Sequence, residues 1–151
     1  MHLLIFGQGP LREKLAAAVN NAGLADVVTF TGFREDLQCW LGCLDILVHP
    51  VDMEGLGVSL LQAAAAAVPI IGSRAGGVPE IIDHEQSGLL IPPGDTQALF
   101  MAMDSLLADK DKRDAMGQQG KLIVEQRFSV AQMVAGNLAV YHKVLQQGTS
   151  A

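Results

Sequence analysis

The chain has 151 residues, of which 50% are hydrophobic and 17% charged, and its formal net charge is −6. These values describe one ordinary domain with enough apolar residues for a core, and they exclude an intrinsically disordered segment. The negative charge disfavours a nucleic-acid-binding protein, which needs basic groups to neutralise phosphates. Because there are two cysteines and no basic leader before the first apolar run, we expect a cytoplasmic protein without a disulfide framework.

Short apolar runs alternate with helical patterns along the chain. The runs predict five strands, at residues 3–6, 27–30, 45–48, 68–72 and 88–91. The helical patterns cover residues 11–21, 35–44, 58–67, 96–107, 109–126 and 129–145, with a short helical turn after residues 76–80. Because each parallel crossover needs a helix, this order predicts a Rossmann-like α/β domain, a doubly wound parallel sheet in one layer. Residues 146–151 are small and polar and predict a flexible tail.

Residues 55–73 contain no formally charged side chain and approach the length of a membrane span. Pro69 would break a helix near its end, and Gln62 would lie in the middle of the apolar segment. Residues 58–67 are rich in Leu and Ala, whereas residues 68–72 contain β-branched residues typical of a strand. We therefore interpret the stretch as a buried helix followed by a buried strand.

Ligands of doubly wound sheets bind beyond the carboxyl ends of the strands, so the candidate loops are residues 7–10, 31–35, 49–57, 73–80 and 92–96. The first loop holds Gly7-Gln8-Gly9, which is typical of a tight turn or of a backbone that approaches a phosphate. A dinucleotide-binding motif would need a third glycine where Arg12 stands, and an acidic residue after the second strand. A nicotinamide-dependent dehydrogenase is therefore disfavoured.

The loop at residues 49–57 carries Glu54 and then a Gly-Leu-Gly sequence, where the next helix begins. The free backbone amides of residues 56–58 would lie at the positive end of this helix, which suits an anion. Gln62 lies about 7 Å further along the helix axis, near the expected position of a ribose attached to a bound pyrophosphate. Glu54 precedes the amides and is placed to accept hydrogen bonds from sugar hydroxyls.

The E-x(7)-E motif of the group 1 glycosyltransferases with the GT-B fold resembles one segment of this chain, Glu54-Gly55-Leu56-Gly57-Val58-Ser59-Leu60-Leu61-Gln62-Ala63. Further segments match other motifs of the family in the right order, at residues 6–11, 28–33, 76–81, 88–95 and 127–129. Residues 1–145 therefore resemble the C-terminal, donor-nucleotide-binding half of such an enzyme, with the N-terminal acceptor domain absent.

This resemblance implies a role for each matching residue. Gly7 and Gly9 would line the cleft, and Gly32, Phe33 and Arg34 would pack against the base. Glu54 would be the catalytic residue that binds donor-sugar hydroxyls, Gln62 would face the ribose, and the amides of Leu56, Gly57 and Val58, next to Gly55, would hold the distal phosphate.

The resemblance also implies a reaction, the transfer of a hexosyl-type sugar from a nucleotide diphosphate such as a UDP- or GDP-sugar. Transfer would retain the anomeric configuration and use neither a metal ion nor another cofactor. The acceptor, a glycan or a lipid, would bind the absent N-terminal domain, which would also provide any peripheral association with the inner membrane face. The isolated chain would bind nucleotide weakly and transfer no sugar, and part of its hydrophobic content would form a face for the absent half.

Two positions depart from the family motif. Gln62 replaces the ribose-binding acid, and an amide offers one acceptor where a carboxylate offers two, so nucleotide binding would be weaker by about 1–2 kcal/mol. Val51 stands where the family usually has serine after Pro50, which removes a hydroxyl contact. Both changes leave open the alternative of a non-catalytic nucleotide-binding or regulatory module with the same fold.

Other chemically reactive side chains receive simpler interpretations. Cys39 and Cys43 are four residues apart on one predicted helix face and are expected in the core, since they have no partner ligands for a metal. His49 ends a predicted strand and either contacts the donor or has a packing role. Arg74 either faces the phosphates or forms a surface ion pair. The scattered histidines are expected at the surface: His2, His84 and His142.

Overall fold

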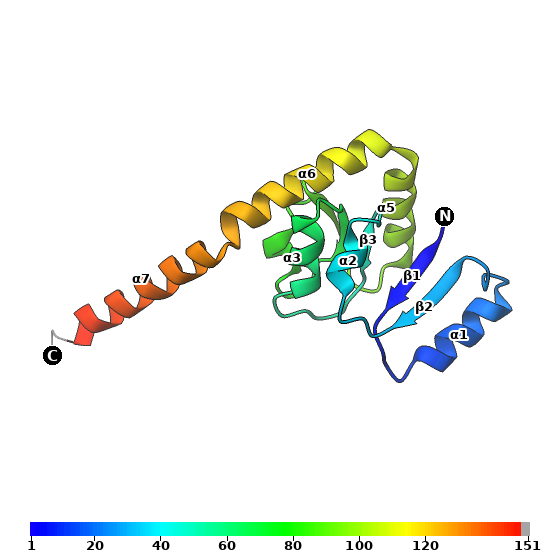
Figure 1. The fold of residues 1–151 in the computed structure, drawn as a ribbon, viewed down its shortest axis with the longest axis horizontal. Coiled ribbons are helices and arrows are strands. Elements are labelled where there is room, and N and C mark those ends of the chain that lie inside the picture. The colour runs from blue at the N-terminus through cyan, green and yellow to red at the C-terminus, as the bar shows by residue number, and fades with distance from the viewer. Residues whose placement is uncertain (149–151) are drawn as a thin grey trace. The chain divides into compact units, whose positions relative to one another are not determined.

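The structure, a computed structural model, describes residues 1–148. The chain divides into two compact units, Met1–Cys39 and Trp40–Ala151, and its helices and strands are drawn in Figure 1. All of the strand pairings are parallel, with helices between successive strands. This arrangement agrees with the Rossmann-like α/β class predicted from the sequence.

In the first unit, β1 (Leu3–Phe6) and β2 (Val28–Gly32) pair in parallel and α1 (Arg12–Asn21) connects them. β2 ends two residues later than expected. The Thr31 hydroxyl donates to the carbonyl of Ile5 (3.1 Å), and the carbonyl of Gly32 accepts from the amide of Gly7 (2.8 Å). These bonds continue the ladder past a shift of register at Ile5. No residue of this unit is fully buried.

The second unit contains a three-stranded sheet in the order β3-β4-β5, formed by β3 (Leu47–His49), β4 (Ile70–Ser73) and β5 (Gly88–Ile91). The helices are α3 (Val58–Ala65), α4 (Val78–Ile81), α5 (Thr96–Ala108), α6 (Lys110–Arg127) and α7 (Val130–Gly148). A short helix, α2 (Leu37–Leu41), precedes β3 and spans the boundary between the units.

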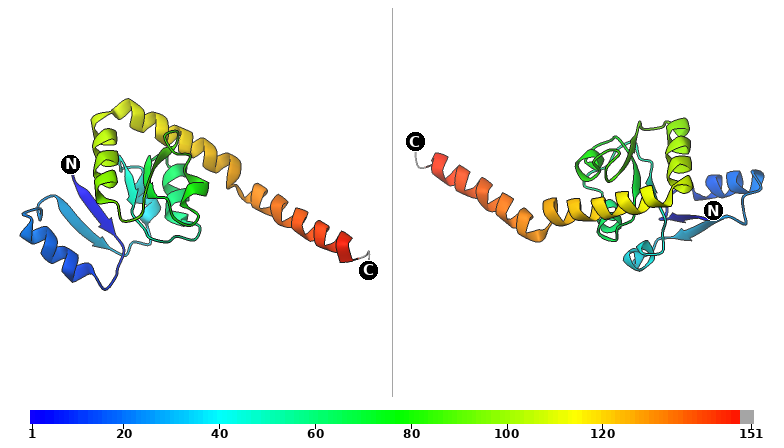
Figure 2. Two further views of the ribbon diagram at one scale, coloured as in Figure 1. Left: turned by 180° about the vertical axis from the view of Figure 1, so that it is seen from behind. Right: turned by 90° about the horizontal axis from the view of Figure 1, so that it is seen from above.

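The core of the second unit lies around β4 and β5, whose residues are all buried. Ile71 and Leu89 pack in one cluster with Leu106 of α5 and Met116 of α6. Figure 2 shows from two sides how α6 runs past both α3 and α5. Two carboxylates cap the starts of α5 and α6: Asp95 accepts from the Ala98 amide (2.8 Å) and Asp109 from the Lys112 amide (2.9 Å).

Several boundaries differ from the sequence prediction. The strands form a two-stranded and a three-stranded hydrogen-bonded sheet, whereas one layer of five strands was expected. α2 has five residues instead of ten, because hydrogen bonds of i→i+3 spacing tighten the chain around Gly42 (Cys43 amide to Trp40 carbonyl, 2.9 Å). α7 continues to Gly148, past the expected start of the flexible tail. The rest of that tail, residues 149–151, lies outside the described residues.

The uncharged stretch forms α3 and then β4, which confirms its interpretation as helix followed by strand. Within residues 1–148, no helix is both long enough and apolar enough to cross a membrane.

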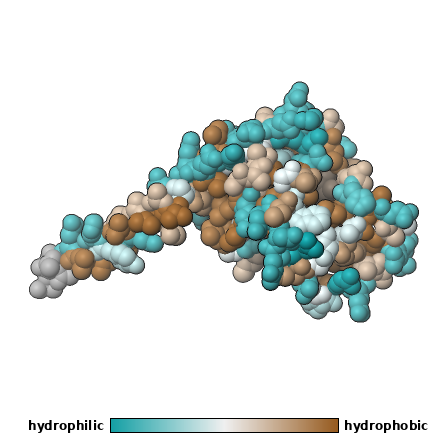
Figure 3. Space-filling view, viewed as in Figure 1, coloured by the Kyte–Doolittle hydropathy of each residue, from teal (hydrophilic) through white to brown (hydrophobic). Residues whose placement is uncertain are grey.

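Every side chain from residue 130 to 147, the length of α7, is exposed. Hydrophobic side chains recur along this helix and appear as brown patches in Figure 3. They are Val130, Met133, Val134, Leu138, Val140, Tyr141, Val144 and Leu145. Their spacing of three and four residues makes α7 an amphipathic helix whose apolar side faces solvent.

Candidate functional site

Glu54 lies in the loop between β3 and α3, and several hydrogen-bond donors surround its carboxylate. One oxygen, Oε1, accepts from the backbone amide of Gly55 (2.9 Å). The other, Oε2, lies 2.8 Å from Nε2 of His49, at the end of β3. The backbone amide of Gly57 has a further, smaller influence, which lowers the pKa of this carboxyl. Glu54 and His49 are both half-buried, with side-chain exposures of 26% and 21%.

These contacts set the charge of Glu54. The hydrogen bond from His49 is the largest cause that lowers the pKa of the Glu54 carboxyl below its ordinary value. Desolvation opposes this effect, while the amides of Gly55 and Gly57 and the charge of His49 add to it. Glu54 is therefore an anion at neutral pH and acts as an acceptor of hydrogen bonds.

The first turn of α3 carries the amides that the sequence assigns to an anion. Gly57 is the residue before the helix, in the left-handed region at φ +70°, and has no side chain that could cap the turn. Its amide helps to lower the pKa of the Glu54 carboxyl, and its contact with a phosphate stays a prediction. Among the described residues, none accepts a hydrogen bond from the amides of Leu56 or Val58. Both of these remain available to a ligand.

A second loop supports the backbone of Glu54. The Gly77 amide donates to the carbonyl of Glu54 (3.2 Å). A Cβ atom on Gly76, which has φ +52°, would overlap that same carbonyl oxygen, and one on Gly77 would overlap the carbonyl of Gly55. The structure thus brings together two of the candidate loops, residues 49–57 and 73–80, and only glycine permits this close approach.

Gln62 lies in α3, one turn beyond the available amides, and is half-buried. Helical geometry places its Cα about 6 Å along the axis from that of Val58. Its position on the helix agrees with the expected spacing, and its contact with a ribose stays a prediction.

The remaining predicted donor-binding residues belong to the first unit. Gly7 and Gly9 line a depression of about 300 Å³ at the turn between β1 and α1. Phe33 is 64% exposed just after β2. The guanidinium of Arg34 forms two hydrogen bonds with Asp36 (2.9 and 2.7 Å), which raise the pKa of Arg34 further. Packing of Gly32, Phe33 and Arg34 against a base stays a prediction.

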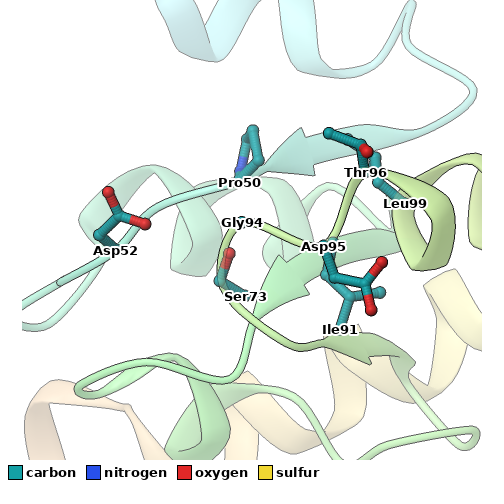
Figure 4. Close-up of a pocket in the computed structure, with 8 residues that line it drawn as sticks. All are labelled: Pro50, Asp52, Ser73, Ile91, Gly94, Asp95, Thr96 and Leu99. Carbon is teal, nitrogen blue, oxygen red and sulfur yellow. The ribbon is translucent and has the colours of Figure 1, made fainter.

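A smaller pocket of about 110 Å³ lies at the carboxyl edge of the three-stranded sheet (Figure 4). It draws on three loops, with Asp52 after β3, Ser73 at the end of β4, and Asp95 after β5. The carboxylates of Asp52 and Asp95 lie on opposite sides of the pocket in Figure 4 and do not converge. Asp95 also caps α5. The volume is too small for a nucleotide sugar.

The two cysteines are not core residues as expected: both are exposed. The short α2 explains the error, because Cys43 lies beyond its end and only Leu41 of this helix is buried. His2, His84 and His142 are exposed as expected, although Nδ1 of His84 accepts from the Leu90 amide (3.0 Å).

Arg74 is exposed, and it forms no ion pair within the described part of the chain. Among residues 1–148, there is no group of three or more His, Cys, Asp or Glu side chains that could hold a metal ion.

Sequence reasoning left the role of His49 open and did not assign Gly76 and Gly77 to the site. The sequence contains a signal for each of them. His49 is the last residue of one strand, and the Gly76-Gly77 pair follows the next strand. Their contacts with Glu54 depend on loop conformations that spacing does not define.

Comparison with known proteins identifies relatives of this chain. The sequence profile of a family described as "Glycosyl transferases group 1" matches residues 1–109. A GDP-mannose-dependent α-(1-6)-phosphatidylinositol monomannoside mannosyltransferase of Mycobacterium tuberculosis is 36% identical over 128 residues, which cover 79% of this chain and 33% of that protein. N-acetyl-α-D-glucosaminyl L-malate synthase of Bacillus anthracis is 32% identical over 95% of this chain and 38% of its own length.

Solved structures give the same result. The Anabaena protein HepE in complex with UDP has a TM-score of 0.84 and 25% identity, covering 93% of this chain and 41% of that one. A C-terminal domain of a group 1 glycosyl transferase family protein from Francisella tularensis has a TM-score of 0.74 and 30% identity, covering 80% and 63%. The chain spans between one third and two fifths of the length of the curated relatives described above.

Proposed function

The chain belongs to the group 1 glycosyl transferases, and we propose that it binds the nucleotide-sugar donor of an enzyme that transfers a glycosyl group. The observation that carries this proposal is the position of the Glu54 carboxylate beside the first turn of α3. An anion acceptor for sugar hydroxyls and two available amides for a phosphate occur within five residues. A sugar diphosphate presents both groups in that order. The UDP complex of HepE supports a nucleotide as the ligand class.

The proposed roles follow from charge. Glu54 is an anion and accepts hydrogen bonds from the hydroxyls of the donor sugar. The amides of Leu56, Gly57 and Val58, at the positive end of α3, stabilise the distal phosphate. Gln62 lies further along the helix, toward the ribose. By the family resemblance, further contacts with the nucleotide are proposed for Gly7, Gly9, Gly32, Phe33 and Arg34.

In the proposed transfer, the bond between the anomeric carbon and the diphosphate oxygen breaks and a bond to the acceptor oxygen forms, while the proton of the acceptor hydroxyl passes to the departing diphosphate. The departing diphosphate gains negative charge, which the amides of α3 stabilise without a metal ion. The anomeric configuration is retained. The acceptor is a glycan or lipid that binds a part of the enzyme outside this sequence, and the apolar side of α7 is a surface available to that part.

Gln62 favours a second candidate, a nucleotide-binding module without catalytic activity. An amide in place of the family's acid removes a charged contact with the ribose. The intact Glu54 loop argues for the enzyme. Addition of the N-terminal half of a relative and measurement of sugar transfer separate the two candidates, because the module would bind donor and never transfer it.

Calorimetric titration of the 151-residue chain tests the proposal with two matched pairs of probes, UDP with UDP-glucose and GDP with GDP-mannose. We expect the sugar nucleotide of one pair to bind more tightly than its diphosphate. Glu54→Gln should raise the Kd of that sugar nucleotide about tenfold, because the substitution removes a charged hydrogen-bond acceptor. Glu125→Gln on the exposed face of α6 is the control. Absence of binding by all probes, or an unchanged affinity in Glu54→Gln, would contradict the proposal, and sugar transfer by the chain without further domains would contradict the assigned dependence on them.

A further inference from the structure

The backbone and the side chain of Glu54 are held by different parts of the second unit. The backbone is fixed by the loop after β4, where the Gly77 amide donates to the Glu54 carbonyl (3.2 Å) and Gly76 lies against it without a Cβ. These contacts involve only the main chain of Glu54. The direction of its carboxylate must therefore depend on contacts of the side chain itself.

One of these contacts comes from the loop that leads into α3. The Gly55 amide donates to Oε1 of Glu54 (2.9 Å), and the amide of Gly57, the residue before α3, helps to lower the pKa of the carboxyl. A carboxylate that settled fully on these amides would act as an internal anion and compete with a phosphate for the same positive end. It would also present fewer free lone pairs to a sugar.

The contact with His49 acts from another element. Nε2 of His49 lies 2.8 Å from Oε2, the oxygen that the Gly55 amide does not use. Since an ionised carboxylate only accepts hydrogen bonds, Nε2 carries the hydrogen. The ring is half-buried, and its backbone belongs to β3, where His49 is paired with Gly72 of β4. A residue anchored in the sheet thus holds one oxygen of a side chain in a loop.

We propose that His49 is a positioning residue, whose Nε2–H holds Oε2 of Glu54 off the backbone amides before α3 and toward the donor sugar, while Oε1 stays on the Gly55 amide. This inference rests on the proposed function of Glu54. His49 itself need not touch the donor. It acts by keeping the Glu54 oxygen that accepts hydrogen bonds from the donor sugar separate from the amides that bind the phosphate.

Three substitutions test the inference on the full chain. In His49→Gln, the side-chain amide can donate from near the position of Nε2, whereas the amide of His49→Asn is too short to reach Glu54. His49→Leu removes the donor while it keeps similar bulk. His142→Leu, on the exposed α7, is the matched control. Thermal unfolding followed by the fluorescence of Trp40 identifies any variant that fails to fold.

The first readout is the ratio of the Kd of the diphosphate to that of its sugar nucleotide, with the UDP and GDP probe pairs. We expect His49→Leu and His49→Asn to reduce this ratio about tenfold, and His49→Gln and His142→Leu to preserve most of it. If His49 had only a general structural role, its substitution would lower the melting temperature of the chain and would leave the ratio of the two Kd values unchanged. An unchanged ratio in folded His49→Leu and His49→Asn would overturn the inference.

The second readout needs no ligand. Carbon-13 NMR of the Glu54 carboxyl should show its pKa rising toward the ordinary value in His49→Leu and His49→Asn, since the donated hydrogen bond is lost. If the wild-type chain binds no probe, the proposed function fails. The titration then still shows whether His49 donates a hydrogen bond to the Glu54 carboxylate. A Glu54 pKa that does not respond to either substitution would overturn the inference.

Discussion

The two units of the chain support their predicted donor-binding residues in different ways. In the second unit, the Glu54 loop connects a strand to a helix whose residue Leu60 has no exposed surface. In the first unit, no residue is fully buried, and Phe33 extends into solvent. A two-stranded sheet with one helix has too little apolar surface to form a core of its own. The Glu54 loop is therefore supported by packing, whereas the Arg34 side chain is held by local hydrogen bonds.

A buried leucine gives the largest expected difference between the units. Leu106→Ala removes a fully buried side chain of α5 from the core cluster and should lower the free energy of unfolding by about 2–5 kcal/mol. Leu15→Ala in α1, where the side chain is 47% exposed, should cost less than about 1 kcal/mol. Urea unfolding followed by Trp40 fluorescence measures both values. Equal losses would contradict the difference in packing.

Two glycines with positive φ provide the next test. Gly76→Ala would place a Cβ against the Glu54 carbonyl and should destabilise the fold by about 2 kcal/mol or more. Gly32→Ala in β2 has a similar φ of +72° but open space around the added atom, so only the backbone strain of about 1 kcal/mol applies. Denaturant midpoints of the two variants compare them directly. A smaller effect at Gly76 would show that the two loops do not approach closely in solution.

Gln62→Glu should strengthen nucleotide binding by a predicted contact residue of the second unit. A carboxylate at this place on α3 restores the charged acceptor of the family motif and should tighten nucleotide diphosphate binding by about 1–2 kcal/mol. Calorimetry with UDP and GDP measures the gain, and Gln118→Glu on the exposed surface of α6 controls for added charge. Unchanged or weaker binding would contradict the assignment of Gln62 to the ribose.

The smallest expected effect is a change of stability with pH at Glu54. Its pKa is lowered in the fold from an ordinary value of 4.5, so the ionised form stabilises the fold at and above that pH. This contribution is lost as the pH falls from 4.5 through the lower pKa of the folded state. Thermal unfolding between neutral pH and pH 3 should show a smaller loss in Glu54→Gln than in the wild-type chain. Parallel curves for the two proteins would contradict the hydrogen bonds assigned to this carboxylate.

Some features followed directly from the sequence. The apolar runs at residues 3–6 and 88–91 coincide with β1 and β5, and the helical patterns at residues 96–107 and 109–126 coincide closely with α5 and α6, which Asp95 and Asp109 cap. These signals are local, because a buried strand needs a continuous apolar run and a helix start needs a side-chain acceptor. The order of motifs was sufficient to indicate the family.

The errors occurred where local signals compete. Residues 35–44 have a helical pattern, yet Gly42 and tight i→i+3 bonds end α2 at Leu41, so that Cys43 lies beyond the helix. β2 continued through Thr31 and Gly32 because a side-chain hydroxyl reached the neighbouring strand. Sequence periodicity assumes that an element continues undisturbed, and it contains no information about such hydrogen bonds to other segments.

By itself, the sequence determined the α/β class, the parallel order of elements and the motif that places Glu54 before the amides of α3. These depend on hydrophobic periodicity, glycine positions and spacing along one chain. Only the tertiary structure decided that His49 contacts the Glu54 carboxylate and that Gly76 and Gly77 support its backbone. Those contacts join the ends of two neighbouring strands, and parallel pairing of β3 with β4 brings their loops to the same edge. The charge and direction of Glu54 are therefore properties of the fold.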